Sequence, residues 1–218
     1  MSKEIQPEQH NKQPQPEGLE RRVFTIEMRA APEGEEGDKR TTVTGYAALF
    51  NSPSEDMGFI EIIEAGAFLE AIGTSDVRAL FNHDPNQILA RTASGTLRVE
   101  EDEKGLRYEF SLPDTTYGRD LAVMLKRGDV SQSSFAFTVK EQAWETKKDE
   151  KGNPTYTRRI KKVERLFDVS PVTYPAYSDT TVALRSMPAV VENPDQKEEI
   201  PSKTHRQRLL EAIERNND

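Results

Sequence analysis

The stretch GDVSQSSFAF, residues 128–137, alternates between two kinds of side chain in its second half. Successive side chains of a strand point to opposite faces, so Ser133 shares a face with Phe135 and the aromatic residue that follows. Ser134 lies on the other face with Ala136, among small and polar groups where a substrate could approach. The stretch therefore predicts a strand with one core face and one face that can carry chemistry.

The same period of two recurs along the middle of the chain and predicts further strands. Alternating apolar residues occupy the segments 24–28, 43–49, 77–81 and 106–110. Polar runs containing glycine at 101–105 and 148–154 predict hairpin turns, and helical patterns at 64–72 and 116–126 interrupt the strands. In the second helix, residues 121 and 123–125 form the predicted apolar side. Many strands with few helices predict a mostly β (α+β) fold, an antiparallel β-barrel or sandwich with helices packed outside.

Composition divides the chain into three parts. Only 34% of the 218 residues are hydrophobic and 31% are charged, which is a low apolar content for one compact domain. Residues 1–20 contain few apolar side chains, so we expect a disordered tail. After a Pro- and Glu-rich linker, Thr204 and Gln207 form a capping-box pattern that opens a short helix. We predict a folded domain at 21–186, followed by the linker and helix at 187–218.

Several classes of protein are disfavoured by composition. A net charge of −8 argues against a nucleic-acid partner, because phosphate affinity comes mainly from clustered Lys and Arg. No apolar run approaches the roughly 20 residues of a membrane span, and the N-terminus lacks the pattern of a secretory signal. The absence of cysteine excludes disulfides, thiolate nucleophiles and Cys-based metal sites. We therefore expect an intracellular protein without a membrane partner, whose chemistry uses hydroxyls, His, Lys or carboxylates.

Two residues could provide a base and a nucleophile. The chain has three histidines, and His10 and His205 lie in the predicted tails, so His83 is the best candidate for a base. Alternation places His83 at the end of the 77–81 strand pattern. Ser134 is the candidate nucleophile, because a serine hydroxyl needs such a base to be activated. A structural histidine and an ordinary strand serine fit the same residues, so these assignments stay hypotheses.

An acid that orients the base could come from either of two positions. Glu164, Leu166, Asp168 and Ser170 share one face of a regular strand. Asp168 lies among apolar residues and would need a specific partner if buried, whereas Glu164 follows a basic cluster. An arginine would serve Asp168 as a structural partner equally well. A zinc site is disfavoured because the predicted domain has no second histidine, and we expect no cofactor.

Four blocks of sequence resemble the caudovirus prohead proteases. Each block alone is weak, but their order and spacing together are specific. They are GYAALFNS at 45–52 with EAGAF at 64–68, NHD at 82–84, GDV at 128–130 with SFAF at 134–137, and DVSPVTYPA at 168–176. The resemblance implies a fold similar to the herpesvirus assemblins, an antiparallel β-barrel surrounded by helices.

The resemblance also implies roles for residues of this chain. His83 would be the general base and Ser134 the nucleophile of a serine protease. Assemblins use a second histidine as the third member of their catalytic triad, and in this chain an acid would replace that histidine. The family's acid-Val-Ser block implies Asp168 in that role, with Glu164 as runner-up and Glu109 as a remoter candidate. The family often has Glu at this position, so Asp168 departs from its pattern by one methylene.

The function implied is peptide hydrolysis through an acyl-enzyme during capsid maturation. The expected substrates are the scaffold region of the major capsid protein, or a scaffold protein, and the protease's own tails. Cleavage would take place inside the phage prohead in the host cytoplasm. A homodimer is compatible with the resemblance. Two alternatives stay open: a catalytically inactive barrel that acts as an internal scaffold or assembly protein, and a small-molecule esterase that uses the same Ser and His.

Overall fold

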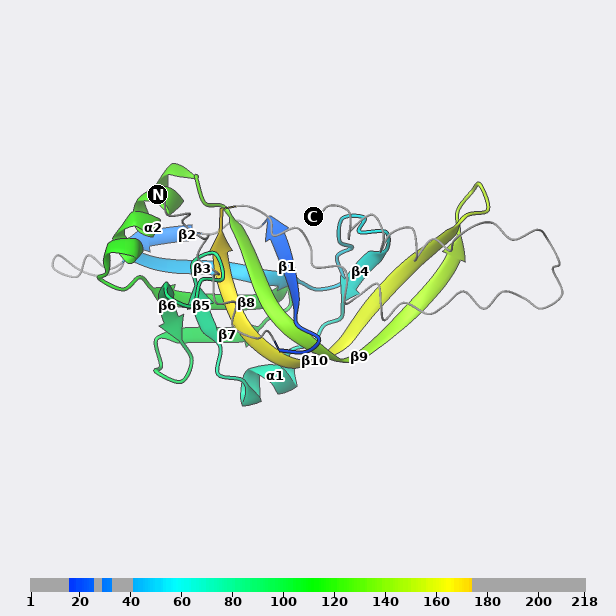
Figure 1. The fold of residues 1–218 in the computed structure, drawn as a ribbon, viewed down its shortest axis with the longest axis horizontal. Coiled ribbons are helices and arrows are strands. Elements are labelled where there is room, and N and C mark those ends of the chain that lie inside the picture. The colour runs from blue at the N-terminus through cyan, green and yellow to red at the C-terminus, as the bar shows by residue number, and fades with distance from the viewer. Residues whose placement is uncertain (1–15, 26–28, 33–40, 174–218) are drawn as a thin grey trace, which may run out of the picture.

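A long β-hairpin is the centre of the fold. The computed structural model describes residues 16–25, 29–32 and 41–173. The hairpin consists of β9 (Gln132–Lys148) and β10 (Pro154–Val172), which pair antiparallel along their length. Figure 1 shows one end of this hairpin inside the body of the molecule and the other end extending beyond it. The predicted turn is confirmed, and the Asp149 carboxylate accepts the backbone N–H groups of Lys151 and Asn153 there.

The other strands complete two sheets. In the first sheet the order is β1-β9-β10-β5-β6, and β4 pairs with another part of β10. The second sheet has the order β2-β3-β8-β7. The remaining strands are β1 (Glu20–Thr25), β2 (Arg29–Pro32), β3 (Thr41–Leu49), β4 (Ile60–Ile63), β5 (Arg78–Leu80), β6 (Ile88–Arg91), β7 (Leu97–Glu101) and β8 (Gly105–Ser111).

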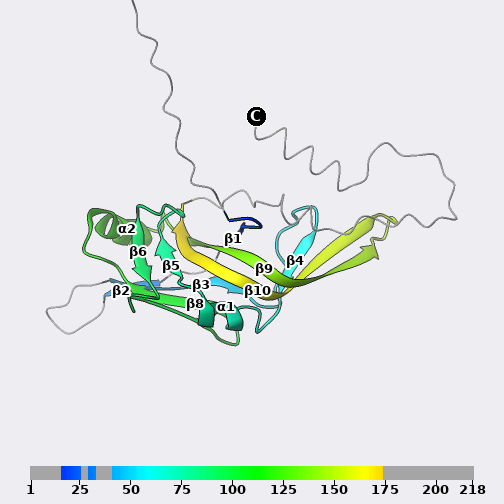
Figure 2. The same ribbon diagram turned by 60° about the horizontal axis from the view of Figure 1, so that its bottom comes forward.

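The hydrophobic core lies between the two sheets. Phe135 and Phe137 of β9 belong to the same buried cluster as Val43 of β3 and Tyr108 and Phe110 of β8. In the turned view of Figure 2, β3 and β8 run on one side of the β9–β10 hairpin. One face of β9 is therefore buried against the second sheet, and its opposite face points away from the core.

Two helices flank these sheets. α2 (Thr116–Arg127) begins where the Thr115 side chain accepts the Gly118 N–H and ends at Gly128, which adopts the left-handed φ of 82° that glycine favours. Its predicted apolar side is only partly right, because the Val123 side chain is exposed. α1 (Leu69–Thr74) is shorter than predicted. Residues 65–68 form a turn before it.

The predicted fold class is confirmed, with differences in strand pairing. The fold is mostly β with few helices, and most neighbouring strands are antiparallel. However, β4 and β5 both run parallel to β10, so the first sheet is mixed. The described strands form two sheets and no closed barrel, so barrel closure stays a prediction.

The predicted terminal segments fall largely outside the described residues. β1 begins at Glu20, the last residue of the predicted N-terminal tail, and this side chain is buried. Residues 187–218, with the helix predicted from Thr204, lie outside the part of the chain that the structure describes. Among the described residues, no helix has the length and apolar character needed to cross a membrane.

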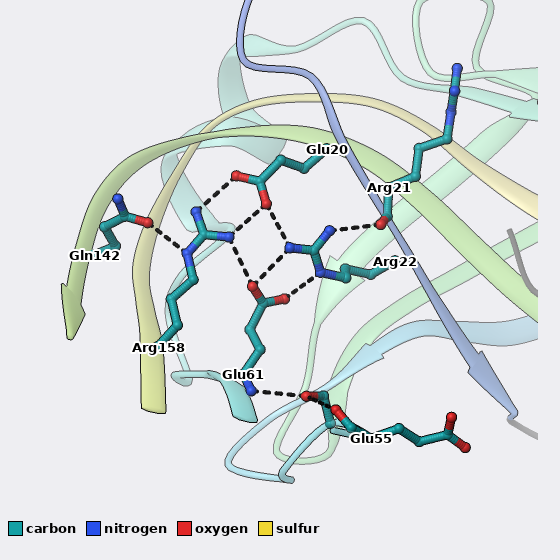
Figure 3. Close-up of polar contacts among 8 residues, drawn as sticks. Glu20, Arg21, Arg22, Glu55, Glu61, Gln142 and Arg158 are labelled. Atoms are coloured by element: carbon teal, nitrogen blue, oxygen red, sulfur yellow. Dashed lines mark hydrogen bonds and ion pairs between the residues drawn. The ribbon is translucent and has the colours of Figure 1, made fainter. Parts of the chain in front are cut away.

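A buried cluster of four charged side chains holds β1 and β4 against the hairpin (Figure 3). Arg22 of β1 donates to Glu20 at 2.6 Å and to Glu61 of β4 at 2.7 Å. Arg158 of β10 donates to the same two carboxylates at 2.6 and 2.9 Å, and to Gln142 of β9 at 2.6 Å. All four charged side chains are at least 96% buried. Because each charge has partners of opposite sign, the cluster can persist without water.

Replacing Glu20 by glutamine should destabilise the protein in a pH-dependent way. Burial raises the pKa of Glu20, but hydrogen bonds and charges from Arg158 and Arg22 outweigh it and hold this pKa below its ordinary value of 4.5. The ionised carboxylate thus stabilises the fold fully above pH 4.5, and this contribution is lost as the pH falls through the lowered folded-state pKa. We expect Glu20→Gln to cost roughly 3 kcal/mol at pH 7, and less in acid.

Chemical denaturation from pH 7 down to the acid range checks this expectation. The matched control is Glu103→Gln, which alters an exposed carboxylate in the turn between β7 and β8. A stability difference between wild type and Glu20→Gln that stayed constant down to the lowest pH would contradict the role given to the charged form.

Candidate active site

Ser133 and Ser134 point to opposite faces of β9, as predicted. The Ser133 hydroxyl faces the core and donates to the Tyr108 hydroxyl at 3.1 Å. Ser134 faces the other way, and its Oγ lies 2.6 Å from Nε2 of His83. The expectation that the Ser134 face is open is wrong in this structure, because the Ser134 residue has no solvent-exposed surface. Part of that cover is the imidazole that lies against its hydroxyl.

The group that the Ser133 hydroxyl contacts, among the described residues, is a phenol and not a base. Burial raises the pKa of Tyr108 to about 12, so its phenol is neutral in the physiological range. A neutral phenol does not activate a serine hydroxyl, whereas an imidazole does. The contacts therefore distinguish the two adjacent serines. Ser134 has an imidazole beside its hydroxyl, which is the base that a serine nucleophile requires.

His83 is held by a turn and not by a strand. β5 ends at Leu80, and Asn82 and His83 both adopt left-handed backbone angles, with φ of 54° and 57°. The prediction that His83 continues the strand pattern is wrong, because two such residues cannot extend a strand. Asn82 fixes the turn to the end of β10: its N–H donates to the Pro171 carbonyl at 3.0 Å, and its side-chain oxygen accepts the Thr173 N–H at 2.9 Å.

Asp168 completes a hydrogen-bond network with His83 and Ser134. Its Oδ1 lies 2.6 Å from Nδ1 of His83, and the Asp168 residue is 94% buried. An ionised carboxylate can only accept, so this contact assigns the proton to Nδ1. Nε2 is then left to accept the hydroxyl proton of Ser134. The tautomer set by Asp168 is the one in which the imidazole can act as a base toward Ser134.

A β-bulge turns Asp168 toward this site. Directly opposed residues of paired strands share a face, and Leu166 pairs with Phe137 whereas Asp168 pairs with Ala136. Phe167 is the extra residue between these two pairs. As a result, Leu166 packs in the core with Phe137, and Asp168 lies on the Ser134 face. The prediction that Leu166 and Asp168 share one face is therefore wrong.

The two other candidate acids lie elsewhere. Glu164 is the extra residue of a second bulge, between the pairs made by Val163 and Arg165, and its side chain is exposed. It lines a cleft of about 550 Å³ together with residues from β9, β10 and the segment after α1. Glu109 lies on β8 in the other sheet and forms an ion pair with Arg107. Of the three acids, Asp168 is the one that contacts His83.

Two contacts of this site were not anticipated from the sequence. Ser170 donates its hydroxyl to Oδ1 of Asp168 at 2.6 Å, and Asn82 fastens the His83 turn to Pro171 and Thr173. The period of two does place Ser170 beside Asp168, so a signal for the first contact was present. The second depends on chain segments far apart in sequence. Among the described residues, no group of three or more His, Asp or Glu side chains is arranged to hold a metal ion.

A hydroxyl, an imidazole and a buried carboxylate joined in this order form the arrangement used by serine hydrolases. A family model described as caudovirus prohead serine protease matches residues 25–193. The chain belongs to this family, and its general activity is that of a phage capsid-maturation protease. Among solved structures, the bacteriophage T4 capsid assembly protease is similar, with 12% identity and a TM-score of 0.40 over 70% of this chain and 98% of that one. No curated protein matches the sequence.

Proposed function

We propose that this protein is the endopeptidase that cleaves the scaffold region of the major capsid protein, or a scaffold protein, and its own tails. Cleavage takes place inside the prohead, in the cytoplasm of the host. The single observation that carries the proposal is the continuous series from Ser134 through His83 to Asp168, with two contacts of 2.6 Å. Membership of the family supplies the class of substrate.

The proposed reaction proceeds through an acyl-enzyme. Ser134 Oγ attacks the scissile carbonyl while Nε2 of His83 accepts the hydroxyl proton, and the Asp168 carboxylate stabilises the imidazolium that forms. The imidazolium then donates the proton to the leaving amine, and the C–N bond breaks. A water molecule, deprotonated by the same imidazole, hydrolyses the ester and restores Ser134.

The burial of the three side chains favours this proposal over an inactive internal scaffold. A polar group that is removed from water costs free energy unless it is hydrogen-bonded, and a scaffold gains nothing from burying three of them. The contacts also arrange donor and acceptor in the direction that a base-activated hydroxyl needs. A small-molecule esterase would use the same contacts, so the substrate has to be tested directly.

Mapping the site of covalent labelling tests the proposal. A small fluorophosphonate reacts with activated serines, and we expect it to form one adduct on the full-length protein, at Ser134. Ser133 and Ser170 are buried serines close by and serve as internal controls. Heat-denatured protein should not be labelled, because labelling requires the folded site. Peptide mass spectrometry identifies the modified residue.

A second measurement separates a protease from an esterase and from a silent protein. A peptide library prepared from a bacterial proteome is incubated with the full-length protein, and new peptide termini are identified by mass spectrometry. We expect cleavage at a defined set of sequences. Labelling without peptide cleavage would indicate an esterase, and the absence of both would favour the inactive scaffold.

A further inference from the structure

The carboxylate of Asp168 receives a second buried hydrogen bond. Ser170 Oγ donates to Oδ1 at 2.6 Å, and this is the same oxygen that lies 2.6 Å from Nδ1 of His83. The Ser170 residue has no solvent-exposed surface. The hydroxyl therefore contacts the atom through which the acid acts on the base.

The sheet fixes where this hydroxyl lies. Ser170 is directly opposite Ser134 in the β9–β10 pairing, and Asp168 is opposite Ala136. Asp168 and Ser170 are two residues apart beyond the Phe167 bulge, so their side chains share the face that carries Ser134. The backbone ladder thus holds Ser170 rigidly beside the carboxylate.

A carboxylate with one hydrogen-bond partner can still rotate. The terminal torsion of an aspartate side chain has a broad, roughly two-fold energy profile, so one contact leaves the plane of the group poorly defined. A second donor on the same oxygen restricts that rotation. A hydroxyl donor also stabilises the ionised form of the carboxylate, which is the form that orients an imidazole.

We propose that Ser170 is a positioning residue, whose hydroxyl fixes the Asp168 carboxylate so that Oδ1 faces Nδ1 of His83. The proposal rests on the proposed function of Ser134, His83 and Asp168. The Ser170 hydroxyl donates to Oδ1 of Asp168, the atom that contacts the base. It acts through Asp168.

Three variants of the full-length protein test this role. Ser170→Ala removes the hydroxyl, Ser170→Thr retains it, and Ser133→Ala removes an equally buried serine hydroxyl that faces the core. The kinetic parameters are measured on the best peptide from the library, and the rate of fluorophosphonate labelling is measured as a function of pH. Thermal unfolding of each variant shows whether it is folded.

We expect Ser170→Ala to lower kcat by about 10²-fold with little change in KM, because the error is in catalytic geometry and not in binding. Without the Ser170 donor, Oδ1 faces Nδ1 of His83 less precisely, so the rate of labelling should fall at every pH measured. Ser170→Thr should restore most of the rate. Ser133→Ala should keep the wild-type kcat and pH profile.

The failures of the two proposals can be told apart. Wild-type kcat and pH profile in Ser170→Ala, together with an inactive Ser134→Ala, would overturn the role of Ser170 and leave the proposed function standing. Equal losses of rate in Ser170→Ala and Ser133→Ala would reduce Ser170 to a structural residue and overturn its role as well. Full activity of Ser134→Ala would overturn the proposed function itself.

Discussion

Replacing Ser134 by alanine should lower the rate of peptide hydrolysis by roughly 10⁶-fold and leave the fold unchanged. The change removes the one atom that lies 2.6 Å from Nε2 of His83. Alanine fits the site because it differs from serine only by the missing hydroxyl, and the next residue on that face of β9, Ala136, is a buried alanine already. The rate is measured on the best peptide from the library, and intact mass shows whether the protein trims its own tails.

A matched control is available on the same strand. Ser133→Ala removes a hydroxyl from the adjacent residue, which is equally buried, and should keep the wild-type rate. Both variants are purified identically, so a contaminating protease would add the same background rate to each. Peptide cleavage by Ser134→Ala at the wild-type rate would rule out Ser134 as the nucleophile.

Asp168→Asn should produce the second-largest loss, a fall in kcat of roughly 10⁴-fold. The amide has almost the shape of the carboxylate, so Ser170 and the β10 ladder should still hold it. It carries no charge to stabilise the imidazolium, and its NH₂ group favours the tautomer with the proton on Nε2. The imidazole is then unable to accept the Ser134 proton.

Glu164→Gln is the control for this substitution. It makes the same chemical change at the exposed bulge residue four positions earlier, and we expect no effect on kcat. Steady-state kinetics of both variants on one peptide checks the pair. Full activity of Asp168→Asn with loss in Glu164→Gln would move the third role to Glu164, and loss only in Glu109→Gln would move it to the other sheet.

The face of the sheet to which each side chain points could be predicted from sequence wherever the strand is regular. Residues 132–137 of β9 pair with β1 without a register shift, so Ser133 and Ser134 face as predicted. The same prediction failed in β10, because the bulges at Glu164 and Phe167 each insert one residue and reverse the faces to which the following side chains point. The sequence of β10 contains no glycine that would have marked these bulges.

Features that depend on distant segments were missed as well. The hairpin turns were predictable, since the Asp149 carboxylate and neighbouring N–H groups lie within a few residues of each other. The parallel pairing of β4 and β5 with β10 leaves no local pattern. The low apolar content of residues 1–20 places Glu20 in a tail, and its burial depends in part on Arg158, which lies 138 residues away in the sequence.

The ribosome synthesises β9 before β10, so the residues of the proposed site become available at different times. Nucleophile and base, in the proposed assignment, are synthesised well before Asp168, which follows His83 by 85 residues. Domains generally fold as units during synthesis, and β10 is the last strand among the described residues. A growing chain that has reached β9 therefore carries a serine and an imidazole without their acid. In the proposed assignment, proteolytic competence therefore cannot arise before β10 has been synthesised.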